Sequence, residues 1–342
     1  MNPLKHSAPV AVLAVSIALA ALTALTACGS SAGSSASPAS SARSSVVVSA
    51  SASTRAPSPG AFPITVKTTT GLVTISAAPK RIVSLSPTAT EDLYADGAGP
   101  QVVAVDETSD YPPGVPKTTL NGTSPNIEAI AGYDPSLVIA AEDTGGLVAG
   151  LKKLGVPVLI EPAAATLAAA YAEIEQIGQA TGHAAQADTV ITGMEAQIAA
   201  DLKKAGTTHS DLSYFWEVSA SPYYSATSQT IFGEIAGMFG LKNIADKVAT
   251  AASGGYPELT EEYIVASKPQ IIFLTDNDPG DGGQTPAIVA ARPGWAGLPA
   301  VKNHEIIALN DDVAARWGPR LPQLVAAIAA AVESASAASA AS

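Results

Sequence analysis

The sequence predicts an α/β protein with two Rossmann-like parallel-sheet lobes joined by a single long helix. Strand-like apolar runs alternate with helical patterns over residues 81–160 and again after residue 212, as is typical of parallel α/β layers. The intervening residues 166–205 contain no strand-like run. The segments EAIAGYDPSLVI (Glu128–Ile139) and EYIVASKPQIIF (Glu262–Phe273) repeat one helix-then-strand unit. This repeat indicates that the two lobes are related by an approximate duplication.

The first 27 residues have the features of an export signal. Lys5 gives a weakly positive start, and residues 10–27 form an uncharged, mainly apolar run. An uncleaved membrane anchor is the alternative, because about 18 apolar residues can just span a bilayer. The stretch LTAC (Leu25–Cys28) looks like a lipobox, whose cysteine becomes the lipid-bearing N-terminus of a bacterial lipoprotein. We therefore expect residues 1–27 to be a lipoprotein signal peptide and Cys28, the only cysteine, to be lipidated.

Residues 28–60 consist almost entirely of Ser, Ala, Val, Pro and Gly. A segment of this composition cannot bury enough apolar surface to order itself, so we expect a lipid-anchored linker. The formal net charge of the chain is −12 at pH 7, which argues against nucleic acid as a partner, because phosphates need a basic face. We expect an extracytoplasmic monomer, anchored to the cell membrane on its periplasmic or outer face.

The first lobe is predicted over residues 61–165. Strands are expected at 81–85, 102–105, 137–140 and 156–160, and helices at 88–96, 126–132 and 145–154. Gly97 and Gly155 follow two of these helices, at the position that glycine favours just beyond a helix C-terminus.

A helical connector is predicted over residues 166–205, with a break at Thr181-Gly182. Its second piece, Ala184–Lys204, would be about 31 Å long as a helix. The second lobe is predicted over residues 206–332. Its strands are expected at 212–218, 271–275 and 305–309, and its helices at 230–239, at 260–267 and from Pro319, a favoured first-turn residue. The tail 333–342 resembles the linker in composition, so we expect it to be disordered.

Several motifs, in the same order, resemble those of the periplasmic binding proteins for vitamin B12 and iron–siderophores, the class III substrate receptors of ABC importers. They are PKRIVSLSPTATEDLYADGAGPQVVAVDETSDYP (Pro79–Pro112), the two Glu-x6-Pro units and RWGPR (Arg316–Arg320). The resemblance covers most of residues 79–332. It implies a rigid joining helix, matched by Ala184–Lys204, and a ligand held in the cleft between the lobes.

The resemblance also implies a role for the repeated glutamates. In the family, one Glu on top of each lobe pairs with arginines of the permease, and the matching positions are Glu128 and Glu262. Two carboxylates far apart on a rigid body would fix orientation as well as attraction. The alternative is that each Glu only interacts with the dipole of its own helix, worth about 0.3–1 kcal/mol. The expected partners are thus an ABC permease and its cytoplasmic ATPase.

The predicted ligand-binding residues lie in loops at strand ends, where parallel α/β sheets bind their ligands. They are Pro87, Tyr111, Tyr224, Tyr256, Asp312, Arg316 and Trp317. By resemblance, Tyr224, Tyr256, Asp312 and Arg316 match positions that touch the ligand in the vitamin B12 binder. A flat corrin or a metal chelate would need aromatic faces and a few oriented polar groups. Two alternatives stay open: Trp317 as a core residue, and Arg316 as the partner of Asp311 or Asp312 in bracing the loop.

Two departures make the first-lobe wall less aromatic than in the vitamin B12 binder. Gly122 replaces a Trp six residues before Glu128, and Thr108 replaces a Tyr shortly before Ser109-Asp110-Tyr111-Pro112. The predicted small-molecule ligand is cobalamin or a related corrinoid, and a ferric siderophore is the alternative.

No cofactor, metal site or enzymatic activity is predicted. His183, His209 and His304 are scattered without ligand-like spacing, and the Asp/Gly-rich stretch 276–282 lacks the spacing and terminal Glu of a calcium loop. Residues 61–332 contain no Gly-x-Ser-x-Gly elbow, P-loop or Gly-x-Gly-x-x-Gly turn. A lipoprotein hydrolase that uses scattered Ser, His and Asp residues is a remote alternative.

Overall fold

The computed structural model describes residues 62–68, 70–277 and 283–341. The described chain begins with an antiparallel hairpin of β1 (Ile64–Thr68) and β2 (Gly71–Ile75), which the sequence analysis did not predict. Val66 and Ile75 bury their side chains in the core of the first lobe. The hairpin therefore belongs to that lobe.

The first lobe is a four-stranded, all-parallel sheet in the order β4-β3-β5-β6. Its elements are β3 (Ile82–Leu85), α1 (Pro87–Ala95), η1 (Gly99–Gln101), β4 (Val102–Val105), α2 (Ile127–Ala131), β5 (Leu137–Ala140), η2 (Thr144–Gly146), α3 (Leu147–Lys153) and β6 (Val158–Ile160). Along β5, Leu137 and Ile139 enter one core, whereas Val138 and Ala140 enter the core on the opposite face. Both faces of the sheet are thus covered, as the apolar runs predict.

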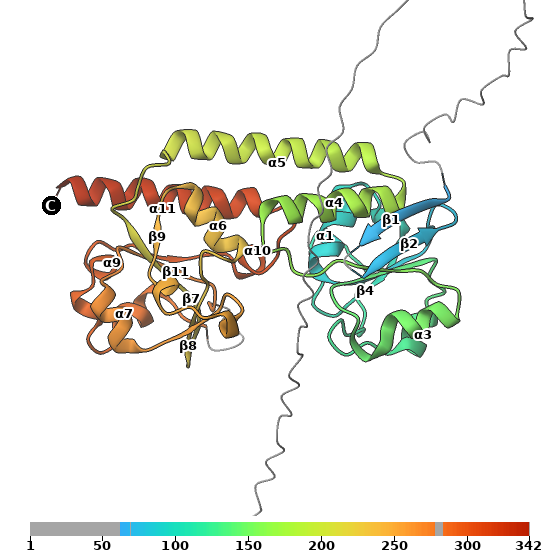
Figure 1. Ribbon diagram of the computed structural model, residues 1–342, viewed down its shortest axis with the longest axis horizontal. Coiled ribbons are helices and arrows are strands. Elements are labelled where there is room, and N and C mark those ends of the chain that lie inside the picture. The colour runs from blue at the N-terminus through green and yellow to red at the C-terminus, as the bar shows by residue number, and fades with distance from the viewer. Residues whose placement is uncertain (1–61, 69, 278–282, 342) are drawn as a thin grey trace, which may run out of the picture. The chain divides into compact units, whose positions relative to one another are not determined.

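Two helices lead from the first lobe to the second. They are α4 (Leu167–Thr181) and α5 (Ala184–Ala205). Gly182, with φ of 86°, ends α4 in the left-handed conformation that glycine adopts without strain. Helix α5 packs against α4 and, further along, against the C-terminal helix α11 (Leu321–Ala341). Figure 1 shows α5 running along both lobes, on the side away from α3 and α7.

The second lobe has a mixed sheet in the order β10-β8-β7-β11-β12, with β9 also paired to β7. Its strands are β7 (Ser213–Ala220), β8 (Tyr223–Ser225), β9 (Lys242–Asn243), β10 (Glu258–Leu259), β11 (Ile271–Leu274) and β12 (Ile306–Ala308). Its helices, besides α11, are α6 (Ile231–Met238), η3 (Ala245–Lys247), η4 (Ala251–Ser253), α7 (Glu261–Ser267), α8 (Pro286–Ala290), η6 (Trp295–Gly297), α9 (Pro299–Lys302) and α10 (Asp311–Ala314).

Each lobe contains four parallel strands in the same arrangement. Strands β9, β7, β11 and β12 pair in parallel in the same chain-order pattern as β4, β3, β5 and β6. Helix α2 precedes β5 and helix α7 precedes β11, so the two repeated sequence units occupy equivalent places. The second lobe differs by the antiparallel addition of β8 and β10.

Side-chain caps explain where many of the helices begin. Helices α1, α2, α4, α6, α7, α8 and α10 each follow a Ser, Thr or Asn whose side chain accepts the N–H of the third helical residue. Each such cap is worth about 1 kcal/mol.

The C-terminal helix corrects two expectations. It begins at Leu321 rather than at Pro319, and it continues through Ala341, so the segment expected to be disordered is helical up to that residue. Ala335 is buried, and Ser334 donates a hydrogen bond to Glu305. By length and composition α11 could cross a membrane, but half of that stretch is buried in the protein, and its apolar residues form the core of the second lobe.

Candidate functional site

A cavity of about 400 Å³ lies between the two lobes. Its first-lobe wall is formed where β3, β4 and β5 end, by residues 85–88, 106–108 and 141–142, together with 121–123. Its second-lobe wall is formed by Asp312 and residues 315–317, in the connection from β12 to α11. The carboxyl ends of the parallel strands therefore face the cavity, as expected for an α/β binding site.

A second cavity, of about 520 Å³, adjoins the first and shares Asp312 and Ala315 with it. It is lined only by second-lobe residues, from the ends of β7 and β11 and from α10. We call the two cavities together the interlobe cleft.

Gly122 is required by the backbone of the first-lobe wall. A Cβ at this position would lie 2.4 Å from the carbonyl oxygen of Leu85, closer than any van der Waals contact allows. No aromatic side chain can therefore replace Gly122 unless the backbone moves. The less aromatic wall expected from the sequence is a consequence of this close approach.

The loop after β4 is fixed by hydrogen bonds to the buried Asp106. Thr108 Oγ1 donates to its carboxylate at 2.6 Å, and Ser109 Oγ donates to its other oxygen. Ser109 is also hydrogen-bonded to Thr90 of α1. This network places the next residue, Asp110, toward the second lobe.

Arg316 lies at the centre of an ionic network that joins the lobes. Its Nη1 donates to Glu91 Oε1 and Asp110 Oδ1, both at 2.9 Å, and its Nη2 donates to Asp312 Oδ1 at 2.7 Å and to the Thr108 carbonyl at 3.3 Å. Burial alone would lower the pKa of Arg316, but its hydrogen bonds to Glu91 and Asp110 raise it overall. The guanidinium thus keeps its charge although only 9% of the side chain is exposed.

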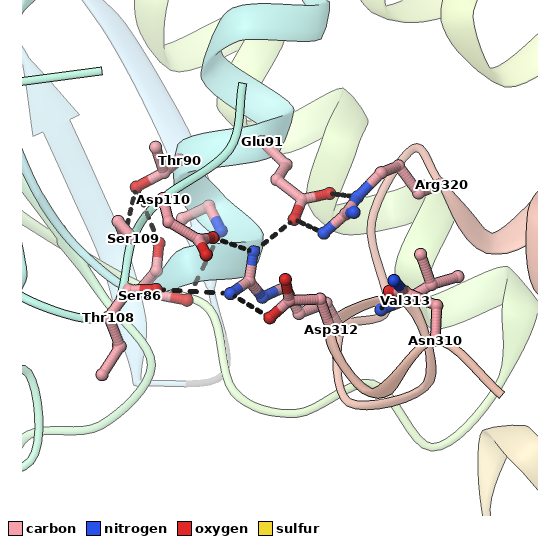
Figure 2. A network of polar contacts seen from close by, with 12 residues as sticks. Ser86, Thr90, Glu91, Thr108, Ser109, Asp110, Asn310, Asp312, Val313 and Arg320 are labelled. Carbon is pink, nitrogen blue, oxygen red and sulfur yellow. Dashed lines mark hydrogen bonds and ion pairs between the residues drawn. The ribbon is translucent and has the colours of Figure 1, made fainter. Parts of the chain in front are cut away.

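A second arginine completes the clamp on Glu91. Arg320 Nε donates to Glu91 Oε2 at 2.7 Å, and its Nη2 donates to Oε1 at 2.5 Å. Figure 2 shows Arg320 to the right of Glu91, Asp110 to its left and Asp312 below them. Tyr111 covers the Arg320 guanidinium, 4.2 Å from the ring centre. A first-lobe carboxylate is thus held by two second-lobe cations.

Buried carboxyl groups gather directly behind this clamp. They are Asp92 of α1, Asp96 at the C-terminal cap of that helix, Glu161 after β6, and Glu173 of α4. Burial raises the pKa of Asp96, Glu161 and Glu173 to about 8 in each case. Burial, together with the neighbouring acids, raises the pKa of Asp92 well above its usual range. Trp317 of the cleft donates its indole N–H to Glu173 at 2.7 Å.

The second cavity is also rich in carboxyl groups, with Asp276, Asp311 and Asp312 in its wall. Burial and the nearby Glu217 raise the pKa of Asp276 to about 6. Glu217 itself is fully buried and paired with Arg292 through two hydrogen bonds of 2.5 and 2.6 Å. That arginine is therefore committed to Glu217 and does not line the cleft.

Four of the seven predicted ligand-binding residues line the interlobe cleft, namely Pro87, Asp312, Arg316 and Trp317. The structure bears on both open alternatives, since Arg316 does pair with Asp312 and Trp317 packs partly against the second-lobe core. The other three residues lie elsewhere. Tyr111 stacks on Arg320, whereas Tyr224 of β8 and Tyr256 before β10 are 39% and 40% exposed and line neither cavity.

Several lining residues were missed by the sequence analysis. They include the polar residues Glu107, Asn121, Glu142, Ser219, Asp276 and Gln284. Glu107, Glu142 and Asp276 stand within two residues of the C-terminal ends of β4, β5 and β11, so the strand-end rule could have found them. The clamp residue Glu91 gives no such signal.

The two glutamates of the repeated units lie in the first turns of α2 and α7. Both side chains are exposed, and neither makes an ion pair or side-chain hydrogen bond with any other described residue. Glu261, the neighbour of Glu262, instead accepts a hydrogen bond from the buried Trp295. Helix α7 lies on the side of its lobe away from α5 (Figure 1).

Within residues 62–68, 70–277 and 283–341, no group of three or more His, Cys, Asp or Glu side chains is placed to hold a metal ion. Part of the Asp/Gly-rich stretch 276–282, and Cys28 with the predicted signal peptide and linker, lie outside the described residues.

Comparisons with known proteins agree with this architecture. A family model described as "Periplasmic binding protein" matches residues 82–313. An uncharacterized ABC transporter substrate-binding lipoprotein of Bacillus subtilis is 34% identical over 76% of this chain and 82% of its own. The crystal structure of the periplasmic vitamin B12 binding protein of Vibrio cholerae has a TM-score of 0.62 at 27% identity, covering 76% of this chain and 98% of that one. A periplasmic heme-binding protein from a Roseiflexus species has a TM-score of 0.63 at 25% identity, covering 75% and 98%.

Proposed function

The chain belongs to the periplasmic binding protein family, and we propose that it is the receptor of an ABC importer that captures cobalamin or a related corrinoid. Proteins of this family are substrate-binding transport proteins and not enzymes. The importer's transmembrane permease and its ATPase are separate chains, which this receptor would serve from outside the cytoplasm.

The observation that carries the proposal is the interlobe cleft itself. The carboxyl ends of parallel strands from both lobes open onto it, with Pro87 and Trp317 on opposite walls. These two side chains offer apolar faces to a flat ligand, and the polar groups around them offer oriented hydrogen bonds to its edge. The likeness to the vitamin B12 binder supports a corrinoid. The nearly equal likeness to the heme binder means that the fold does not select the ligand.

Equilibrium titration of the purified protein with cyanocobalamin, dicyanocobinamide, haemin, ferrichrome and a ferric catecholate tests the ligand class. We expect quenching of tryptophan fluorescence and saturable heat with a corrinoid, because Trp317 lies in the cleft wall. The matched variant is Trp317→Phe, which lacks this fluorophore, so its ligand binding is measured by calorimetry. Binding of a ferric siderophore with no response to either corrinoid would replace the corrinoid by the alternative ligand.

We also propose that Glu128 and Glu262 dock the receptor on the permease. They are free carboxylates at equivalent positions of two lobes that a long helix holds apart. Two such charges would fix the orientation of the receptor and speed its encounter with a basic permease surface. A role limited to the helix dipole would need no exposure and no second copy.

Charge reversal tests docking. We expect Glu128→Lys with Glu262→Lys to abolish binding to permease-containing vesicles and uptake, while ligand affinity of the isolated receptor is unchanged. The control is Asp188→Lys with Glu195→Lys, which makes the same charge change at exposed positions of α5. Glu261→Lys is not a suitable control because Glu261 holds Trp295. Docking is refuted if both double variants support uptake equally well.

The lipid anchor remains part of the proposal. Mass spectrometry of the membrane-extracted protein should show a diacylglyceryl group on Cys28 and no residues before it. Cys28→Ala should leave the protein unprocessed and without lipid. An unmodified Cys28 within a retained N-terminal segment would favour the uncleaved anchor.

A further inference from the structure

The cation of the interlobe cleft is already saturated by the protein's own oxygens. Arg316 directs the N–H groups of its two terminal nitrogens at three carboxylates and one carbonyl, at 2.7 to 3.3 Å. Two of these carboxylates, Glu91 and Asp110, come from the first lobe. An incoming carboxylate could bind those nitrogens only by displacing one of these partners.

The remaining charge of the cleft is negative. The charged residues that line the two cavities in the described part of the chain are Arg316 and six carboxyl residues: Asp106, Glu107, Glu142, Asp276, Asp311 and Asp312. Burial and the neighbours Asp110 and Asp311 raise the pKa of Asp312, against the lowering effect of Arg316. The local field therefore opposes a further negative charge even beside the arginine.

We propose that Glu91 and Asp110 determine ligand specificity by neutralising Arg316, so that the cleft selects ligands with hydrogen-bond donors or positive charge along the edge and rejects carboxylates. The inference rests on the proposed function and narrows it. The primary amides of a corrinoid's side chains donate hydrogen bonds to carboxylates and carbonyls. The propionates of haem or the acid groups of a carboxylate siderophore would meet like charges, which is how a site excludes a competitor of similar shape.

Asp110 is the residue that allows a clean test. Its side chain is 51% exposed, so replacing it does not open the core. Among the described residues, only Arg316 forms a hydrogen bond or ion pair with its carboxylate. Glu91 is unsuitable because it is buried between two arginines. Asp188 provides the control, since it is an exposed carboxylate of α5 that lines neither cavity of the cleft.

The experiment compares two ligands that share one corrin ring. Dicyanocobinamide carries amide side chains, whereas dicyanocobyrinic acid carries carboxylates at the same positions. We expect the wild-type protein to bind the amide form at least about 100-fold more tightly, because like-charge contacts cost several kcal/mol and about 1.4 kcal/mol is tenfold in affinity. Asp110→Asn should narrow this ratio about tenfold, because the neutral amide no longer offsets the charge of Arg316. Asp110→Glu should keep the wild-type ratio, and Asp188→Asn should change it by less than about threefold.

Equal wild-type affinities for the two ligands would overturn the proposal, as would an Asp110→Asn variant with an unchanged ratio or an Asp188→Asn variant with the same change. If neither corrinoid binds, the corrinoid assignment fails separately. The charge proposal is then decided by haemin and its dimethyl ester, of which the ester must bind more tightly to the wild-type protein.

Discussion

Glu91 and Asp92 are adjacent residues of α1, and both are almost completely buried, with 3% and 1% of their surface exposed. Their surroundings are opposite. Glu91 is held by Arg316 and Arg320 of the second lobe. Within the described part of the chain, neither carboxyl oxygen of Asp92 has a hydrogen-bond partner, and the charged groups that raise its pKa are other acids.

The two sides of this helix therefore give buried charge different consequences. On the arginine side, Glu91 is paired with two guanidinium groups of the second lobe, and these ion pairs tie the lobes together. On the acid side, burial favours the protonated form, because an unpaired buried carboxylate costs far more than a neutral carboxyl. The partner, and not the depth of burial, decides whether a buried acid is a structural ion or a proton-binding group.

The largest effect is expected when Glu91, the carboxylate that the two arginines share, is removed. Glu91→Ala would leave two cations with 9% and 13% exposed side chains short of their common partner. We expect the free energy of unfolding to fall by about 3–5 kcal/mol, the usual cost of breaking a buried ion pair from one side. Chemical denaturation at pH 7 measures it.

Two variants calibrate that loss. Glu91→Gln keeps the size of the side chain and one of its two acceptor oxygens, so it should lose less stability than the alanine variant. Lys204→Ala removes an ion pair with Glu333 whose side chains are 70% and 38% exposed, and it should cost at most about 0.5 kcal/mol. If Glu91→Ala is as mild as Lys204→Ala, the clamp does not hold the lobes.

The buried carboxyl groups that have no cationic partner predict an unusual pH dependence of the free energy of unfolding. Asp96, Glu161 and Glu173 have pKa values of about 8 in the folded protein and ordinary values when unfolded. Between about pH 4.5 and 8 the folded state therefore binds more protons, so the free energy of unfolding falls as pH rises, by up to about 1.4 kcal/mol per pH unit for each group. We expect the protein to be more stable at pH 5.5 than at pH 8.

Asp92→Asn should sharpen this result, because it removes one buried acid and the repulsion that it exerts on its neighbours. At pH 8 the variant should be more stable than the wild type by about 1 kcal/mol or more, with a smaller loss of stability between pH 5.5 and 8. Asp188→Asn, at an exposed position of α5, should leave both values unchanged. A wild-type stability that rises with pH over this range would contradict the assignment of protonated acids.

The smallest effect is expected at Trp317, which lines the cleft and contacts the buried acid Glu173. Trp317→Phe removes the indole donor to Glu173 and should cost about 1 kcal/mol. Because that hydrogen bond lowers the pKa of Glu173, its loss should also move the upper limb of the stability profile to higher pH. Denaturation curves at several pH values measure both changes. An unchanged pH profile would show that Trp317 does not affect the pKa of Glu173.

Much of the fold could be predicted because its signals are local. The uninterrupted apolar runs that form β4, β5 and β11 are where the sequence indicates them. The short strands β8, β9 and β10 were not predicted, since two or three residues carry no periodicity. The Ala/Ser-rich tail was wrongly expected to be disordered. Its composition is uninformative, and its helix is stabilised by packing on residues distant in sequence, such as Glu305 and His209.

The cleft was predicted less completely, for the same reason. Pro87, Asp312, Arg316 and Trp317 could be found because they follow strands. Glu91 could not, because an acid within a helix ordinarily indicates a solvent-exposed face, and its partner Arg316 is 225 residues away along the chain. The tyrosines of β8 and the loop before β10 were expected in the cleft because aromatic residues in loops often bind ligands, but they lie outside its two cavities.

The most direct test of this account is a crystal structure of the protein with dicyanocobinamide bound. We expect the corrin ring between Pro87 and Trp317, its amides donating to acids of the cleft, and Arg316 still bonded to Glu91 and Asp110. A ligand bound outside the interlobe cleft, or an Arg316 that leaves Glu91 and Asp110 to bind the ligand, would contradict it.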